Sequence, residues 1–250
     1  MVRPRYIIAE LGIGHDGSRD RWRRMIEAAV EAGADAIKGQ WWSSPEAMAT
    51  HRGGNLELFQ RYHMPLEWLE DIPAGVDRMC TVYLPQDVSA VVDRVAKFKV
   101  GSWESHDEAL LIEYEQQSEK DIVISTGGWS GPMLRSRRRE VNRLYLHCIS
   151  AYPTAIEDVQ LGAIGRYDLD GFSDHTGLIR MGGYAALAGA QIIEAHLRHY
   201  LTDPQNPDWS VSLDPEAFAG YVRNIREAER CLGAGSRIRS PGERWHDSAS

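Results

Sequence analysis

GFSDHTG (residues 171–177) and GAQIIEAH (residues 189–196) each contain a short apolar run that ends in polar side chains. Six further runs of this kind occur earlier in the chain, and helical stretches separate them. The predicted strands are Tyr6–Glu10, Ala36–Gln40, Met79–Tyr83, Phe98–Gly101, Ile122–Ser125, Leu144–Cys148, Gly171–Ser173 and Gln191–Glu194. Because eight strands separated by helices are typical of a parallel barrel, the sequence predicts an α/β fold, the (β/α)8 TIM barrel.

The first and last helices carry clear boundary signals. Ser18 can cap a first helix whose apolar residues recur at helical spacing, and Asp214 before Pro215 is typical of a helix start. Gly233 predicts the end of that last helix. We therefore expect one catalytic barrel domain over residues 1–232. Residues 233–250 are rich in Gly, Ser, Arg and Pro, and we expect them to form a loosely ordered tail.

Composition limits the partners and the compartment. The chain has 250 residues, which suits one barrel, and its formal net charge of −8 disfavours nucleic acid as a partner. An anionic small substrate stays possible, because a local basic pocket can oppose the global charge. The three cysteines match no zinc spacing, and no apolar run is long enough for a signal peptide or a membrane span. These features predict a cytoplasmic protein without membrane association.

Polar side chains gather at the predicted strand ends. The active site of a parallel barrel lies at the C-terminal ends of its strands, so polar residues there are candidates for chemistry. These positions hold Glu10, Lys38, Gln40, Lys99, Ser102, Glu104, Ser125, His147, Ser150, Tyr152, Ser173, His175, Glu194 and His196. So many polar groups at one rim indicate a functional site.

Eight segments at these strand ends resemble the sialic acid synthase family, also called N-acetylneuraminate synthases. They are IAELGIGHDG (8–17), GADAIKGQ (33–40), FKVGSWE (98–104), VISTGG (123–128), LHCISAYPTAIEDVQL (146–161), GFSDHTG (171–177), GAQIIEAH (189–196) and PDWSVSLDPEAF (207–218). The resemblance implies a transferase that condenses phosphoenolpyruvate with a sugar-like or other aldehyde. The products would be a 2-keto acid of the nonulosonic type and phosphate.

The resemblance also implies a divalent-metal site at the ends of the last two strands. His175 and His196 match the two metal ligands of the family, and neutral imidazole binds Mn²⁺ and similar ions well. We expect Mn²⁺ or Mg²⁺ there, acting as a Lewis acid on the aldehyde carbonyl. The alternative for either residue is an ordinary hydrogen-bonded core histidine.

Further residues match the family's phosphoenolpyruvate site. Lys38 and Lys99 match lysines that hold this ligand, and two buried lysines suit a molecule with a phosphate and a carboxylate. The other expected binding residues are Ser102, Ser125, Ser150, Tyr152 and Ser173. The expected catalytic residues are Lys99 and two carboxylates, Glu104 and Glu10, which could take the proton of the attacking water.

The acceptor side departs from the family pattern. Gln40, Asp208 and Trp209 are the expected acceptor-binding residues, although the family's Pro-Asp-His segment ends in Trp209 here. We also expect a barrel-only member without the appended antifreeze-like domain, which in the family supplies a sugar-contacting arginine to the partner subunit. A homodimer would then form through the barrel. These departures predict an acceptor other than free N-acetylmannosamine.

Two other functions stay open from the sequence. One is a metal-dependent aldolase or lyase that uses the same barrel without phosphoenolpyruvate, and the other is a non-catalytic ligand-binding relative. Retention of Lys38, Lys99 and Glu104 favours the condensing enzyme over both.

Overall fold

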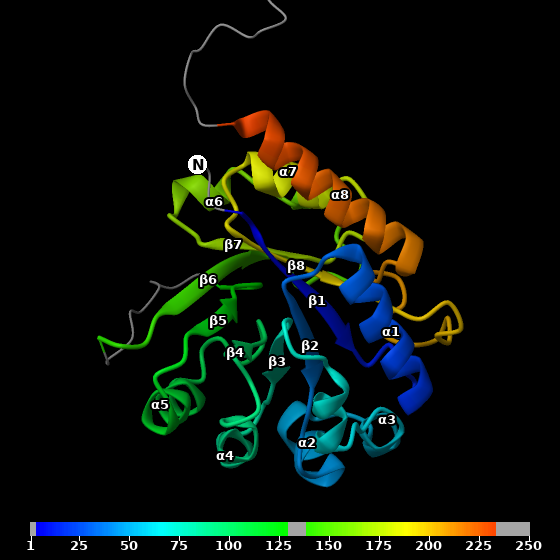
Figure 1. Cartoon of the computed structure of the whole chain (residues 1–250). Helices are drawn as coiled ribbons and strands as arrows, with labels where there is room; N and C mark the ends of the chain where they lie inside the picture. The colour runs from blue at the N-terminus through cyan, green and yellow to red at the C-terminus, as the bar shows by residue number, and fades with distance from the viewer. Residues whose placement is uncertain (1–3, 130–138, 234–250) are drawn as a thin grey trace, which may run out of the picture.

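The barrel closes as the sequence predicts. The structure is a computed structural model that describes residues 4–129 and 139–233. Parallel strands follow one another in chain order around a closed barrel, and the last strand pairs with the first (Figure 1). They are β1 (Tyr6–Gly12), β2 (Ala36–Gln40), β3 (Asp77–Thr81), β4 (Lys97–Val100), β5 (Ile122–Ser125), β6 (Arg143–Cys148), β7 (Gly171–Asp174) and β8 (Ile192–His196). All eight predicted strands are confirmed.

Helices of unequal length cover the outside of the barrel. The α-helices are α1 (Arg19–Ala32), α2 (Pro45–Arg52), α3 (Leu56–Arg61), α4 (Val88–Val91), α5 (Glu108–Gln117), α6 (Ala163–Arg166), α7 (Met181–Leu187) and α8 (Pro215–Leu232), and short 3-10 turns are η1 (Leu66–Asp71), η2 (Pro85–Asp87) and η3 (Ile156–Asp158). Ser18 accepts a hydrogen bond from the Arg21 N–H, and Asp214 accepts one from the Ala217 N–H. Both predicted N-caps are therefore confirmed.

Alternate residues along the strands separate the barrel interior from the helix-facing side. Successive strand side chains point to opposite faces, so residues two apart share a face. One face forms an apolar cluster of Ile8, Ala36, Met79, Val123, Leu146 and Ile192. Two residues further along five of those strands stand the polar residues Glu10, Lys38, Thr81, Ser125 and Glu194. A polar layer therefore lies directly above the apolar plug of the barrel.

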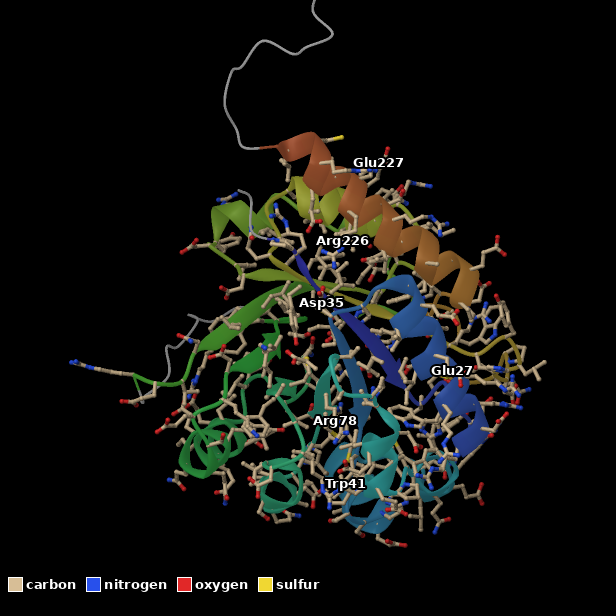
Figure 2. The ribbon with its side chains drawn as sticks, in the orientation of Figure 1. Glu27, Asp35, Trp41, Arg78, Arg226 and Glu227 are labelled. Carbon is tan, nitrogen blue, oxygen red and sulfur yellow. The ribbon has the colours of Figure 1, made fainter. Side chains whose placement is uncertain are left out.

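The long C-terminal helix closes the barrel against the N-terminal part of the chain. Helix α8 packs beside both α1 and α7, as Figure 1 shows. At the N-terminal end of the barrel Arg226 of α8 pairs with Asp35 at 3.0 Å, and the two residues lie close together in Figure 2. Arg226 also donates to the Arg5 carbonyl at 2.9 Å. These contacts anchor α8 to the end of the barrel opposite the polar layer.

One histidine of the first motif belongs to the core. His15 is fully buried, with its ring edge-on to Trp22 and Trp68. Its Nδ1 accepts a hydrogen bond from the Gly17 N–H at 2.9 Å. Burial lowers the pKa of His15 to about 4, although Asp16 acts in the opposite direction. His15 is therefore a neutral structural residue at neutral pH.

Three expectations about the rest of the chain stay predictions. Apart from Gly233, which ends α8, the expected tail lies outside the described residues. The domain boundary and a homodimer through the barrel are likewise untested. Within residues 4–129 and 139–233, no helix is both long and apolar enough to cross a bilayer.

Candidate active site

A pocket of about 520 Å³ opens at the C-terminal ends of the strands. Its walls comprise Glu10, Lys38, Gln40, Arg52, Thr81, Tyr83, Lys99, Gly101, Ser102, Trp103, Ser125, Gly127, Gly128, Ser150, Tyr152, Ser173, His175, Glu194 and His196. Most residues that the sequence predicts for the site are therefore brought together. Four of the candidates stand outside the lining: Glu104, His147, Asp208 and Trp209.

The floor of the pocket carries two lysines, each beside a carboxylate. Lys38 Nζ lies 2.5 Å from Glu10 Oε2, and Lys99 Nζ lies 3.7 Å from Glu194 Oε1. Burial lowers the pKa of Lys99, whereas at Lys38 the neighbouring carboxylates outweigh burial and the pKa is raised. Burial would raise the pKa of Glu194, but Lys99 and Lys38 hold it below its ordinary value. The floor thus places lysines and carboxylates together in one buried cluster.

Hydroxyl groups and a glycine turn border these lysines. Lys99 Nζ donates to Ser125 Oγ at 2.9 Å, and the Gly127 N–H donates to Ser102 Oγ at 3.0 Å. A Cβ atom on Gly127 would lie 2.1 Å from Ser150 Oγ, so a side chain there would displace the hydroxyl. Glycine lets the serines approach the backbone, and convergent N–H, hydroxyl and ammonium groups suit a phosphate or carboxylate.

His175 and His196 stand side by side at the ends of β7 and β8. Their ring centroids are 5.3 Å apart. His175 Nδ1 donates to the Ile149 carbonyl at 2.8 Å, and its Nε2 lies 2.9 Å from the Tyr152 hydroxyl. His196 Nδ1 lies 3.6 Å from Asp208 Oδ2, and this carboxylate raises the pKa of His196 against the lowering effect of burial. With both Nδ1 atoms held, the Nε2 atoms are the ones a metal could use, and at His175 the metal would replace the Tyr152 hydroxyl as the partner of Nε2.

The surroundings of the histidine pair fit a divalent cation. Asp208 Oδ2 and Glu194 Oε2 are buried and have no hydrogen-bond partner among the described residues. Gly12, at φ +45°, makes room for Asp208, whose Oδ2 would lie 2.8 Å from a Cβ there. In the described part of the chain, no three His, Cys, Asp or Glu side chains form a complete metal cage. An ion on His175 and His196 would therefore take further ligands from water or substrate.

Glu104 lies behind the pocket wall. Its Oε2 would be 3.2 Å from a Cβ on Gly101, which does line the pocket. Its Oε1 is 2.8 Å from Arg52 Nη2 and 3.2 Å from His51 Nε2. Burial raises the pKa of Glu104, and Arg52 and His51 offset only part of this effect. Glu104 therefore lies beside two lining residues, Arg52 and Gly101, without lining the pocket itself.

The expected acceptor residues separate into different environments. Gln40 lines the pocket, where its Nε2 donates to Glu10 Oε1 at 2.7 Å and its Oε1 accepts from the Tyr83 hydroxyl at 2.7 Å. Asp208 stands one layer back, beside His196. The structure does not bring Trp209 to the pocket, because its ring lies under the Arg198 guanidinium at 4.8 Å.

The sequence prediction missed several lining residues. Thr81 and Tyr83 lie at and just after the end of β3, so the strand-end rule applied to that strand finds both. Thr81 Oγ1 accepts a hydrogen bond from Lys38 Nζ at 2.9 Å. Trp103 was not missed, since it stands within the matched FKVGSWE segment just after a predicted strand, and it lines the pocket. Arg52 ends the short helix α2 between β2 and β3, and no sequence signal marks it.

Comparisons with known proteins agree with this geometry. The sequence profile of the NeuB family matches residues 25–237. An uncharacterized protein of Methanocaldococcus jannaschii is 31% identical over 96% of this chain and 76% of its own length. The pseudaminic acid synthase of Campylobacter jejuni is 30% identical, covering 92% of this chain and 75% of its own. The crystal structure of N-acetylneuraminic acid synthetase from Leptospira borgpetersenii, in complex with citrate, superposes with a TM-score of 0.81 at 25% identity, covering 96% and 89% of the two chains.

Proposed function

The chain belongs to the NeuB family, and on that premise we propose that it condenses phosphoenolpyruvate with a sugar-like aldehyde in a metal-dependent reaction. Membership confirms the resemblance to sialic acid synthases and the class of enzyme, a phosphoenolpyruvate-dependent transferase that forms a carbon–carbon bond. The metal, the acceptor and the residue roles are our proposals. One observation supports them most: paired buried lysines, a serine-lined glycine turn and two histidines share one pocket.

Phosphoenolpyruvate binds over the pocket floor. Its carboxylate and phosphate are anions, and Lys38 and Lys99 are the buried cations available to them. The N–H and hydroxyl groups around Gly127 supply further donors. The residues assigned to this ligand are Lys38, Lys99, Ser102, Ser125, Ser150, Tyr152 and Ser173.

The acceptor binds above this floor, with its aldehyde group toward the histidine pair. Gln40 is the lining residue assigned to its hydroxyl groups, and Asp208 acts from behind by orienting His196. Because an acceptor placed here lies directly over phosphoenolpyruvate, the two reacting carbons can approach without further rearrangement.

The bond changes follow from the chemistry of the two substrates. The C3 carbon of phosphoenolpyruvate attacks the aldehyde carbon, a carbon–carbon bond forms, and the aldehyde oxygen takes up a proton. Water then adds to C2 and gives its proton to a carboxylate, for which Glu10 on the pocket wall is placed. The bond between C2 and the ester oxygen of the phosphate then breaks, and phosphate leaves with the electron pair. The C2 hydroxyl gives its proton to the departing phosphate and becomes the carbonyl of the 2-keto acid. Lys99 and Lys38 stabilise the developing negative charge on phosphate.

A divalent ion, Mn²⁺ or Mg²⁺, would be held by His175 and His196. When bound, it supplies a Lewis acid that polarises the aldehyde carbonyl. Asp208 fixes the orientation of the His196 ring, and Ile149 fixes that of the His175 ring. Such supporting contacts on the second ring nitrogen strengthen metal binding by imidazole.

Phosphate release tests the proposal. The protein is incubated with phosphoenolpyruvate and Mn²⁺ across a panel of aldehydes that includes N-acetylmannosamine, and free phosphate and 2-keto acid are measured. Release that requires both metal and aldehyde is the expected result. Metal-dependent cleavage of a keto acid without phosphate release would indicate an aldolase instead, and binding without turnover would indicate a non-catalytic relative.

Two substitutions connect the activity to the pocket. His175→Ala and Lys99→Ala should each abolish phosphate release, because each removes a group that a substrate or the metal needs. Arg24→Gln is the matched control, since Arg24 and Asp20 form an exposed ion pair on α1 and neither residue lines the pocket. Normal turnover in either pocket variant would refute the residue assignment.

A further inference from the structure

Arg52 is a cationic side chain in the pocket wall that the sequence did not assign to the site. It ends helix α2, in the segment between β2 and β3, and lines the pocket beside Tyr83 and Trp103. Its guanidinium carbon lies 5.1 Å from the ring centroid of Tyr83 and 5.1 Å from that of Trp103. Its Nη2 lies 2.8 Å from Glu104 Oε1. The guanidinium is thus held by two aromatic rings and one carboxylate.

These contacts restrict the guanidinium while leaving donors free. Cation–π contacts with two aromatic rings restrict the plane of the guanidinium group. They leave its charge and its fork of N–H groups unchanged. Only Nη2 is hydrogen-bonded to Glu104 in the contacts described, and Nε is buried without a hydrogen-bond partner among the described residues. Side-chain exposure is 23% for Arg52 and 1% for Glu104. Of the two, Arg52 is therefore the residue that a ligand in the pocket can reach.

We propose that Arg52 binds a phosphate or carboxylate group of a substrate, and that Glu104 is a positioning residue that acts through Arg52. This inference rests on the proposed function for its choice of substrates. The guanidinium fork matches the geometry of phosphate and carboxylate oxygens. Glu104, behind Gly101, holds Nη2 of this fork.

The position of Arg52 in the barrel narrows the source of the anion. Strands β3 and β4, which Arg52 overlies through Tyr83 and Trp103, are four strands away from β7 and β8 in the closed ring. Arg52 therefore approaches from the side opposite His175 and His196. An acceptor whose aldehyde meets the histidine pair could reach Arg52 with an anionic group at its far end. The phosphate of phosphoenolpyruvate is the other possible source.

Steady-state kinetics on a matched pair of acceptors distinguish these sources. KM and kcat are measured with phosphoenolpyruvate and with either N-acetylmannosamine or N-acetylmannosamine 6-phosphate, for the wild type, Arg52→Gln, Arg52→Lys and Arg24→Gln. Arg52→Gln should raise KM for the substrate that carries the anion by about tenfold or more, with kcat within about threefold. Arg52→Lys should restore part of the affinity, and Arg24→Gln should match the wild type. A rise in KM confined to N-acetylmannosamine 6-phosphate would show that Arg52 binds the anionic group of the acceptor. A rise in KM for phosphoenolpyruvate would show that Arg52 binds the phosphate of phosphoenolpyruvate.

Glu104→Gln and the double variant test the positioning role. If Glu104 acts through Arg52, Glu104→Gln raises the same KM as Arg52→Gln, and the double variant is no worse than the more impaired single variant. Loss of kcat in Glu104→Gln with normal kinetics in Arg52→Gln would show that Glu104 acts directly on the substrate and would overturn the proposal. Far-UV circular dichroism confirms that each variant is folded.

A binding measurement separates this inference from the proposed reaction. Thermal-shift titrations with phosphoenolpyruvate and with N-acetylmannosamine 6-phosphate need no turnover. If the wild type releases no phosphate with any aldehyde, the proposed function fails, whereas weaker binding of one of these anions by Arg52→Gln still supports the inference. Equal binding of both anions by the wild type and Arg52→Gln would refute it.

Discussion

Replacement of Lys38 by methionine should destabilise the barrel as well as inactivate the site. Lys38 Nζ lies 2.5 Å from Glu10 Oε2, and the two side chains are 4% and 1% exposed. Methionine has a similar shape but no charge, so Glu10 would be left as a buried carboxylate without its cation. Gln40 Nε2 would remain as a donor to Glu10 Oε1 at 2.7 Å. One neutral amide does not replace a buried ammonium group.

The expected loss follows from the cost of an unpaired buried charge. Removing one partner of a buried ion pair costs about 3–5 kcal/mol. For a chain of this size each kcal/mol lowers the melting temperature by about 2–4 °C, so the single variant should melt about 6–20 °C lower. In the double variant Lys38→Met/Glu10→Gln both charges are absent, and most of the loss in unfolding free energy should be recovered because the remaining groups are neutral.

Urea denaturation at pH 7 measures these free energies of unfolding. Glu10→Gln completes the double-mutant cycle, and Arg24→Gln reports on an exposed pair that should contribute at most about 1 kcal/mol. The reasoning is refuted if Lys38→Met unfolds with the free energy of the wild type. It is also refuted if the double variant is as unstable as Lys38→Met, since the loss would then come from packing or from the hydrogen bond to Thr81.

Three further predictions test other parts of the structure. The pKa of His15 is about 4 in the folded chain and about 6.5 when unfolded, so the unfolded state binds more protons below pH 6.5. The free energy of unfolding should therefore fall on acidification, by about 2 kcal/mol at pH 5 and about 3 kcal/mol near pH 4. Urea titrations should show this loss in the wild type and a flatter pH dependence in His15→Gln. Gly127→Ala should raise KM for phosphoenolpyruvate by about tenfold or more, because its Cβ would meet Ser150 Oγ at 2.1 Å, whereas Gly165→Ala, with open space at its Cβ, should not. Trp209→Ala should leave KM for the acceptor within about twofold, since its ring lies under Arg198, and a much larger rise would place this side chain in the site.

Much of the site is predictable because a strand has a period of two. Once a strand is placed, every second side chain faces the same side, and in a parallel barrel the inward side chains at the C-terminal ends must meet. This rule alone brings Lys38, Lys99, Ser125, Ser173 and His196 to one pocket, as the structure shows. Errors of one or two residues in the strand ends do not matter, since the periodicity continues beyond the last hydrogen bond.

The rule fails where a residue reaches the pocket from outside the strands. Arg52 arrives on a short helix between two strands, and its position depends on contacts with Tyr83, Trp103 and Glu104 that are distant in sequence. Trp209 is the opposite case, a residue that the sequence assigned to the site and the structure does not bring there. It follows Asp208 in a matched motif, but its ring lies under Arg198. Loop residues are set by packing between segments, and one sequence carries no periodic signal for that packing.

Glu10 shows why the two halves of the site depend on closure of the barrel. In the strand register Glu10 stands opposite Lys38 on β2 and opposite His196 on β8. One carboxylate on the first strand therefore adjoins the lysine pair on one side and the histidine pair on the other. Only the pairing of β1 with β8 creates this arrangement, since it closes the ring and places residues 10 and 196 opposite each other. A chain whose first and last strands are not paired could retain the apolar pattern of each strand, but it would not bring the lysine pair and the histidine pair into one pocket.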